Sequence, residues 1–367
     1  MYPIETLESR RLMSVSLNAV SHLLTVNGTA GDDVIKVAVV GDKVRVTDNG
    51  VVSNFLKSKV TKIAVFAKDG TDQVAVESSV FLPTELHTGA GGYDEVKGGS
   101  GKDTIYVEST SSNGYGNGGD DKVVVTSFDG RGYGNAGNDT IVVAMGEGQG
   151  HGGDGNDTIS VTWADNTYID AGAGNDVVRL TNPANYSGDN GIIGGPGVDT
   201  VDYSGIGGDL VLRNDAWSGH YFSPGGVVTP VSDTDGITGV ENLTGGAGND
   251  IITGTAGKNI LKGNGGNDTI RGMAGGDVLW GAAGNDKLYG GDGADALQGE
   301  AGDDFLQGDA GNDFLSGGTG ADALHGNDGD DVFYSKDGAA DFLAGGLGYD
   351  QATKDAMDII TGIEAIS

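Results

Sequence analysis

Carboxylate side chains recur at a fixed spacing in the second half of the chain. From Gly245 to Tyr334 the sequence divides into ten consecutive nine-residue units, and the sixth residue is aspartate in nine of them, the exception being Asn259. Calcium takes about six to eight hard oxygen ligands, so short carboxylates combined with backbone carbonyls suit it. We therefore expect these units to bind several Ca²⁺ ions. The candidate ligands are Asp250, Asp268, Asp277, Asp286, Asp295, Asp304, Asp313, Asp322 and Asp331.

The first half of the chain carries the same unit less regularly. Units with glycine at the fourth position and aspartate at the sixth begin at Gly98, Gly116, Gly134 and Gly152, so that every second nine-residue unit carries the motif. Their aspartates should stack in one column on one side. The first-half candidates are Asp94, Asp103, Asp121, Asp139, Asp157, Asp176 and Asp199. Asp33 also fits the unit, but the spacing gives it no neighbour in register.

The composition does not favour binding sites for other metals or chemistry that depends on cysteine. The chain has no cysteine, and its five histidines share no metal-ligand spacing. Softer metals such as zinc prefer thiolate or imidazole ligands, so zinc is a poor candidate.

Three further columns of residues must position the carboxylates. The first and fourth residues of all ten units are glycine, which can bend a turn through positive φ without a clash at Cβ. The eighth residue is large and apolar in every unit, from Ile252 to Phe333. A flexible glycine-rich linker has no reason to keep four columns in register, so the pattern predicts an ordered repeat.

The unit resembles the G-G-x-G-x-D-x-U-x pattern of the RTX (repeats-in-toxin) family of secreted bacterial proteins. The resemblance directly covers 245–334. It implies an all-β fold, a right-handed parallel β-roll or β-helix solenoid in which two nonapeptides make one 18-residue coil. It also implies that calcium lies between the turns of successive coils, held by the sixth-position carboxylates and backbone carbonyls.

The interruptions of the repeat divide the chain into segments. Leu7–Ser14 resembles the LEPR-XLL motif of bacterial exported proteins, with Ser9 in place of proline and Met13 in place of the second leucine. The C-terminal segment is a candidate for the uncleaved signal that guides RTX proteins through a type I exporter. We expect a targeting-like tail over 1–22, a partly degenerate solenoid over 23–202, a non-repeat excursion over 203–242, a calcium β-roll over 243–344 and a cap over 345–367.

The composition limits the partners. The chain has 367 residues, 70 of them glycine, and a formal net charge of −32, which repels nucleic acid. No apolar run approaches the ~18 residues of a transmembrane helix, so we expect no transmembrane segment. We expect an extracellular or cell-surface protein whose partners are calcium ions and surface polysaccharide or another cell-surface protein.

The calcium is expected to be structural. Unpaired carboxylates on coils about 4.8 Å apart repel one another by roughly 1 kcal/mol in water and about 4 kcal/mol at an effective dielectric constant near 20. Bound calcium removes this repulsion and adds its binding free energy to folding. Strands of the first half, such as 122–125 and 140–143, are richer in β-branched residues. Residues 30–200 are therefore expected to keep some β-structure without calcium, unlike 245–334.

Catalytic signatures are absent, which favours a protein without enzymatic activity that is structural or adhesive at the cell surface or matrix. There is no H-E-x-x-H, G-x-S-x-G or P-loop sequence. Two alternatives stay open: a polysaccharide lyase or epimerase on a β-helix, and a carbohydrate-binding module. The second would use the segment 203–242 together with Tyr115 and Tyr133, which recur with His151 once in every two units and should stack on successive coils.

Overall fold

The protein is built almost entirely from short strands. The computed structural model describes residues 14–162, 167–181, 191–207, 210–213 and 236–367, and in these ranges the only helix is the 3₁₀ turn η1 (Lys57–Lys59). Contacts divide the chain into two compact units, one of Met1–Trp163 with Thr167–Gly174 and one of Ala164–Asn166 with Asn175–Ser367. Residues 7–13 of the export-like motif and 214–235 of the expected excursion lie outside the described residues.

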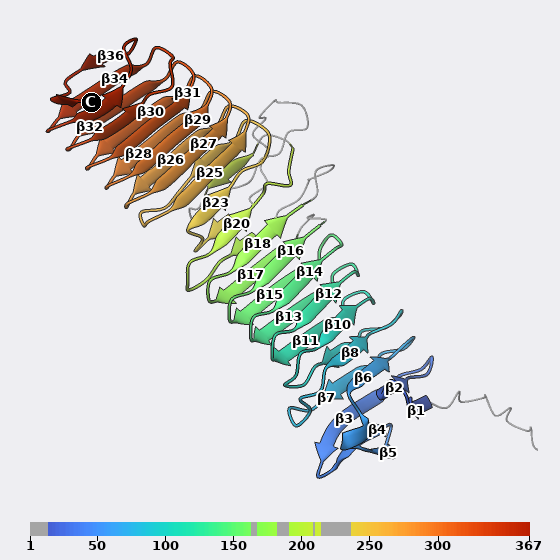
Figure 1. The fold of residues 1–367 in the computed structure, drawn as a ribbon. Helices are drawn as coiled ribbons and strands as arrows, with labels where there is room; N and C mark the ends of the chain where they lie inside the picture. The colour runs from blue at the N-terminus through green and yellow to red at the C-terminus, as the bar shows by residue number, and fades with distance from the viewer. Residues whose placement is uncertain (1–13, 163–166, 182–190, 208–209, 214–235) are drawn as a thin grey trace, which may run out of the picture. The chain divides into compact units, whose positions relative to one another are not determined.

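In the first unit the chain alternates between two parallel sheets, so that each coil gives one strand to each (Figure 1). One sheet contains, in spatial order, β2 (Leu23–Asn27), β6 (Lys62–Phe66), β8 (Thr84–His87), β10 (Thr104–Val107), β12 (Lys122–Val125), β14 (Thr140–Val143) and β16 (Thr158–Val161). The other contains β3 (Val34–Val40), β7 (Gln73–Val76), β9 (Glu95–Lys97), β11 (Asn113–Gly118), β13 (Arg131–Ala136), β15 (Gln149–Asp154) and β17 (Tyr168–Ala173).

Antiparallel strands close the N-terminal end of this unit. β1 (Ser14–Leu17) pairs with β2, and β4 (Lys43–Asp48) and β5 (Val51–Leu56) extend the second sheet beyond β3. Asn49 and Gly50 join β4 to β5 with φ of 44° and 87°, as expected for a two-residue hairpin turn. The hairpin makes the first coil much longer than the two nonapeptides of a regular coil.

The second unit repeats the same construction of stacked parallel strands. One sheet contains β18 (Val177–Leu180), β20 (Thr200–Asp202), β23 (Asn242–Thr244), β25 (Ile260–Gly265), β27 (Val278–Ala283), β29 (Ala296–Ala301), β31 (Phe314–Thr319), β33 (Val332–Ser335), β35 (Gln351–Lys354) and β37 (Ala365–Ile366). Another contains β21 (Val211–Arg213), β24 (Ile251–Thr253), β26 (Thr269–Ala274), β28 (Lys287–Asp292), β30 (Phe305–Ala310), β32 (Ala323–Asp328), β34 (Phe342–Leu347) and β36 (Ile359–Thr361). β19 (Gly191–Ile193) pairs with β22 (Gly236–Thr238).

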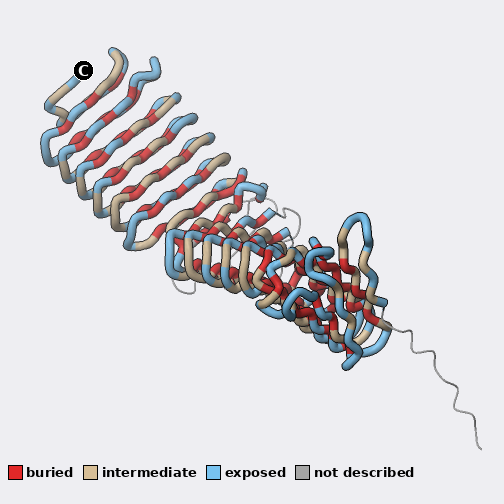
Figure 2. The backbone as a smooth tube through the Cα atoms, turned by 60° about the horizontal axis from the view of Figure 1, so that its bottom comes forward, coloured by how far each residue is buried: buried red, intermediate tan, exposed pale blue. Residues whose placement is uncertain are grey.

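The core is a row of apolar side chains inside the coils. In a strand successive side chains point to opposite faces, so alternate residues of each strand point inward. Leu279, Leu288 and Leu297, at the eighth position of their units, are fully buried, as are Val123 and Ile141 in the first unit. Buried stretches recur in every coil in Figure 2. The prediction of an all-β parallel solenoid with 18-residue coils is confirmed.

Candidate calcium sites

The sixth-position carboxylates of the second unit form two buried columns. In one column the main-chain N–H of Asp268 donates a hydrogen bond to Oδ1 of Asp286 over 2.7 Å, and that of Asp286 donates to Asp304 in the same way. Identical bonds connect Asp250, Asp268, Asp286, Asp304, Asp322 and Asp341 on one edge. The other edge contains Asn259, Asp277, Asp295, Asp313, Asp331 and Asp350.

The first unit has a matching column on one edge and a shorter one on the other. The N–H of Asp103 donates to Oδ1 of Asp121 over 2.7 Å, and the same bond continues through Asp139 to Asp157. These four aspartates therefore stack as the 18-residue spacing predicts. Upstream, Thr84 donates through its N–H and its hydroxyl to Asp103.

Asp33 does have a neighbour in register, contrary to the prediction from spacing. Its N–H donates to Oδ1 of Asp72 over 2.8 Å, and Asp72 donates in turn to Asp94. The β4–β5 hairpin lies between them in sequence and separates Asp33 from Asp72 by 39 residues. A search for 18-residue steps therefore misses this pairing, although AKDGTDQVA at 67–75 is a weaker copy of the repeat with Asp72 at its sixth position.

Other members of the columns are carboxylates that the repeat pattern did not single out. Asp176 donates through its N–H to Asp199, and Asp199 donates to Oε2 of Glu241, 42 residues away. At the C-terminal end Asp350 donates to Glu364. The sequence GGLGYD at 345–350 repeats the glycine and aspartate pattern, so Asp350 had a sequence signal, whereas the two glutamates did not.

Many of these carboxylates leave their second oxygen buried and unpaired. Within the described part of the chain, this oxygen has no hydrogen-bond partner in a set of aspartates from both units. They are Asp72, Asp121, Asp139, Asp199, Asp277, Asp286, Asp295, Asp304, Asp313, Asp322, Asp331 and Asp350. A buried, unpaired carboxylate oxygen is costly, and a bound cation removes that cost.

Burial also shifts the protonation of these groups. Removal from water raises the pKa of Asp121, Asp304 and Asp313 to about 7, and neighbouring carboxylates add to the effect. It raises the pKa of Asp139 and Asp277 to about 6. Without a cation these columns therefore hold negative charge poorly near neutral pH.

The glycines leave room for oxygen atoms around each carboxylate. A Cβ on Gly272 would overlap Oδ2 of Asp277 and lie 2.6 Å from the carbonyl oxygen of Gly290 on the next coil. Gly275 has a φ of 122°, and a Cβ there would lie 2.7 Å from the carbonyl oxygen of Gly257. Carboxylate and carbonyl oxygens thus converge in a space that only glycine keeps open.

The donor set fits calcium and not a softer metal. No group of three or more His, Cys, Asp or Glu side chains gathers at one point among the residues that the structure describes. Each site would therefore combine one or two carboxylates with backbone carbonyls, which is a calcium-type oxygen set.

Not every predicted ligand has a free oxygen. Both carboxylate oxygens of Asp103 accept hydrogen bonds, one from Thr84 and the other from the Gly99 N–H over 2.7 Å. Oδ2 of Asp94 accepts from the hydroxyl of Ser109 over 2.5 Å, and the Asp94 N–H donates to the hydroxyl of Ser112. Both oxygens of Asp94 are thus satisfied by main-chain and hydroxyl donors, and the hydrogen-bonded column ends there.

The stacking of Tyr115, Tyr133 and His151 is confirmed. Ring centroids of Tyr115 and Tyr133 lie 4.6 Å apart with an angle of 9° between the planes, and Tyr133 and His151 stack at 4.6 Å and 10°. Lys97 lies over Tyr115, with Nζ 5.4 Å from the ring centroid. The ring faces are thus covered by one another, and a sugar that stacks on an aromatic face would find only ring edges on the two tyrosines.

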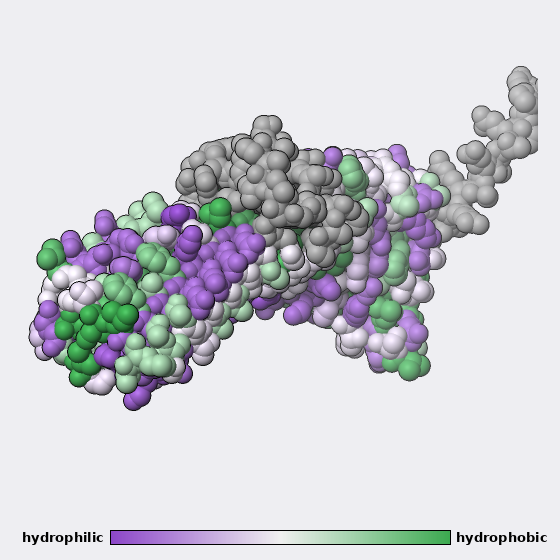
Figure 3. Space-filling view, turned by 90° about the horizontal axis from the view of Figure 1, so that it is seen from above, coloured by the Kyte–Doolittle hydropathy of each residue, from purple (hydrophilic) through white to green (hydrophobic). Residues whose placement is uncertain are grey.

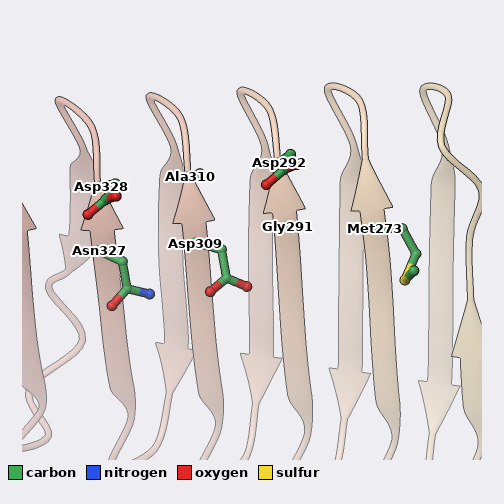
Figure 4. Close-up of a pocket in the computed structure, with 7 residues that line it drawn as sticks. All are labelled: Met273, Gly291, Asp292, Asp309, Ala310, Asn327 and Asp328. Atoms are coloured by element: carbon green, nitrogen blue, oxygen red, sulfur yellow. The ribbon is translucent and has the colours of Figure 1, made fainter.

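A groove on the second unit also offers no catalytic set. Its volume is about 420 Å³, and Figure 4 shows its polar side chains in a row on successive strands. The lining is Met273, Gly291, Asp292, Asp309, Ala310, Asn327 and Asp328. It includes no lysine, arginine or histidine, so a polysaccharide lyase or epimerase would lack an electrophilic partner there. Hydrophilic side chains also cover much of the face of this half of the chain in Figure 3.

Comparison with known families agrees with the geometry. The family model of the RTX calcium-binding nonapeptide repeat matches residues 88–109, 235–270, 262–297, 271–306, 289–324 and 307–339. No curated protein sequence matches the chain at a significant level. Among the described residues, no helix is long and apolar enough to cross a membrane.

Proposed function

Because this chain carries RTX calcium-binding nonapeptide repeats, we propose that it is an exported protein whose β-roll folds on calcium and has a structural or adhesive role at the cell surface or matrix. The observation that supports this function best is the double column of buried carboxylates, in which Asp277, Asp286, Asp295, Asp304, Asp313, Asp322, Asp331 and Asp350 have an unpaired second oxygen. Such columns are unfavourable in a calcium-free protein and favourable once each carboxylate faces a cation.

The proposed ligands fall into three groups. Those with a buried, unpaired oxygen come first: Asp277, Asp286, Asp295, Asp304, Asp313, Asp322 and Asp331, with Asp121, Asp139 and Asp199 upstream and Asp72 and Asp350 added by the structure. Asp157, Asp176 and Asp268 lie in the same columns and are proposed on that ground. Asp94, Asp103 and Asp250 have both oxygens hydrogen-bonded and come last.

Calcium would neutralise the carboxylates and tie each coil to the next. In a solenoid each repeat contacts only its neighbours, so every coil depends on the one before it for stability. A cation between two turns strengthens that contact directly. The proposed role is therefore mechanical: a stiff, acidic solenoid that carries no chemistry of its own.

The proposed export agrees with the calcium affinity that is typical of such sites. Extracellular calcium modules bind with dissociation constants of about 10⁻⁴–10⁻³ M. Sites of this affinity stay empty at the low calcium concentration of a cytosol and fill outside the cell. The chain would then leave the cell unfolded and fold on arrival.

The experiment is far-ultraviolet circular dichroism of the whole protein during a calcium titration, with magnesium as the control. We expect a cooperative rise of β-signal near millimolar calcium and none with magnesium, because magnesium dehydrates reluctantly and demands a stricter octahedral geometry. A fully folded spectrum in chelator would overturn the proposal that the columns are structural calcium sites.

A further inference from the structure

Strand β5 (Val51–Leu56) is an open edge of the first unit. It pairs with β4 on one side and is the last strand at that end of its sheet. Three of its six residues expose apolar side chains: Val51 by 68%, Val52 by 52% and Leu56 by 51%. An exposed apolar edge strand is a template for pairing with another strand.

The backbone of β5 offers a regular row of unused groups. The N–H of Lys57 donates a hydrogen bond to the carbonyl of Asp42, which directly precedes β4, over 2.8 Å. Successive N–H groups of a strand point to alternate sides, so this bond fixes which N–H groups of β5 face β4. The N–H groups of Val52, Asn54 and Leu56 therefore point away from β4, towards the open side. In the described structure no strand takes these groups.

The order of side chains along β5 makes the strand complementary to a second, antiparallel copy of itself. If two copies pair antiparallel about a two-fold axis at Asn54, Val52 lies opposite Leu56 of the second copy, and Asn54 lies opposite its own counterpart. All three opposed pairs are then hydrogen-bonded pairs, which exchange six main-chain bonds in total. Val52 and Leu56 then form apolar cross-strand pairs, and the two Asn54 side chains face each other.

The charges at the two ends of the strand favour the same arrangement. Lys57 and Lys59 follow β5 at one end, and the exposed Asp32 lies near the hairpin tip at the other, next to the buried Asp33 to which Asn49 donates over 3.0 Å. Reversal about the two-fold axis brings the basic end of each copy towards the acidic tip of the other. A parallel pair would place like charges together.

We infer that β5 is the contact through which two copies of this chain form an antiparallel, two-fold symmetric dimer. An isologous contact of this kind needs a surface that is complementary to itself, which β5 supplies. It continues the β3–β4–β5 sheet of one copy into that of the other by strand addition. One six-residue strand is a small interface, so the dimer is reversible and concentration-dependent.

The absence of cysteine allows a direct test of the register. In a hydrogen-bonded antiparallel pair the Cα atoms lie about 5.5 Å apart, within the roughly 4.4–6.8 Å that a disulfide spans. In the calcium-loaded full chain, Asn54→Cys should therefore cross-link to itself on mild oxidation. Val52→Cys alone should not, whereas a mixture of Val52→Cys and Leu56→Cys chains should. No link at Asn54, or equal links at all three positions, would overturn the inference.

Sedimentation of the cysteine-free chain supplies the second test. Asn54→Pro removes one outward N–H, a change that an edge strand tolerates, and should weaken dimerisation at least tenfold. Asn54→Ala keeps the N–H and should leave most of the dimer intact. Leu56→Lys keeps the backbone but should separate the copies if the proline variant folds poorly. A wild-type chain that stays monomeric at every concentration contradicts the dimer, and leaves the calcium titration unaffected.

Discussion

The main-chain N–H of Asp286 donates a hydrogen bond to Oδ1 of Asp304, 2.7 Å away and 18 residues further along the chain. The bond orients the Asp304 side chain towards the preceding coil and occupies one of its two carboxylate oxygens as an acceptor. The other oxygen, Oδ2, stays buried without a hydrogen-bond partner. A single side chain thus joins two coils through the backbone and presents a charged oxygen for a cation.

Asp304→Asn should weaken calcium-dependent folding. The variant keeps an Oδ1 acceptor for Asp286 but loses the charge, so we expect the calcium-loaded protein to lose about 1–3 kcal/mol of unfolding free energy. It should also raise the calcium concentration at the folding midpoint. In chelator the same variant should be no less stable than the wild type, since it removes a buried negative charge. Thermal melts in calcium measure the first effect, and the far-ultraviolet β-signal in chelator measures the second.

The neighbouring residue supplies the control for that variant. Asp303 is exposed, and its Oδ1 accepts the N–H of Ala321 over 2.9 Å. Asn285 accepts the N–H of Asp303 itself in the same way one coil earlier, so asparagine suits this row. Asp303→Asn should therefore change stability by less than about 0.5 kcal/mol. Equal losses from both variants would show that charge in general, and not the buried column, carries the calcium effect.

Acid should stabilise the calcium-free protein. The folded-state pKa is about 7 for Asp304 and Asp313 and about 6 for Asp322 and Asp331, above the roughly 3.9 of an unfolded aspartate. A raised folded-state pKa means that the contribution to stability is complete below pH ~4 and is lost as the pH rises through about 6–7. The far-ultraviolet β-signal of the protein in calcium-free buffer should therefore be stronger at pH 5 than at pH 7.5.

The pH effect should reverse when calcium is present, because protons and calcium compete for the same carboxylates. An Asp304→Asn, Asp313→Asn double variant should show a flatter pH dependence in calcium-free buffer. Higher stability at pH 7.5 than at pH 5 without calcium would contradict the assignment of these groups as buried, charge-strained carboxylates.

Fourth-position glycines should be intolerant of a side chain. Gly293 has a φ of 146°, and a Cβ there would overlap the carbonyl oxygen of Gly275. We expect Gly293→Ala to cost about 2–5 kcal/mol through backbone strain and overpacking. Gly265 is the control: its Cβ would approach nothing closer than 3.8 Å, and alanine fills the corresponding third position at Ala274 and Ala283. Gly265→Ala should be nearly neutral in the same calcium-loaded melts.

The sequence was sufficient where the repeat is uninterrupted. Spacing alone placed Asp121 beside Asp139, and the eighth-position Leu279 and Leu288 in the core, because identical 18-residue steps return the chain to the same point of the coil. These relations depend only on period, which a sequence displays directly.

Spacing failed where the chain leaves the coil and returns to it. The β4–β5 hairpin hides the contact between Asp33 and Asp72, and 42 residues separate Asp199 from Glu241. The hydroxyl groups that end a column were equally hard to predict, because Ser109 lies in the unit 107–115, which lacks the glycine and aspartate of the motif. Such partners are set by three-dimensional proximity and not by period.

The two units should differ in how far they depend on calcium. β12 and β14 of the first unit are rich in valine and isoleucine, and Asp94 and Asp103 are satisfied by hydroxyl and main-chain donors. β28 and β30 of the second unit lie between two columns, in which Asp286, Asp295 and Asp304 each keep a buried second oxygen without a hydrogen-bond partner. In chelator, hydrogen exchange of the full chain should therefore protect β12 and β14 more than β28 and β30.

Calcium should raise the protection of β28 and β30 more than that of β12 and β14, because the coils of β28 and β30 have carboxylate columns on both edges and those of β12 and β14 have one column, which contains Asp121 and Asp139. The calcium-loaded chain is the control in which both regions are slow to exchange. Exchange at the same rate in both regions in chelator would contradict this prediction. It would show that β-propensity and hydroxyl partners do not compensate for the missing cation, and that all coils fold as one calcium-dependent unit.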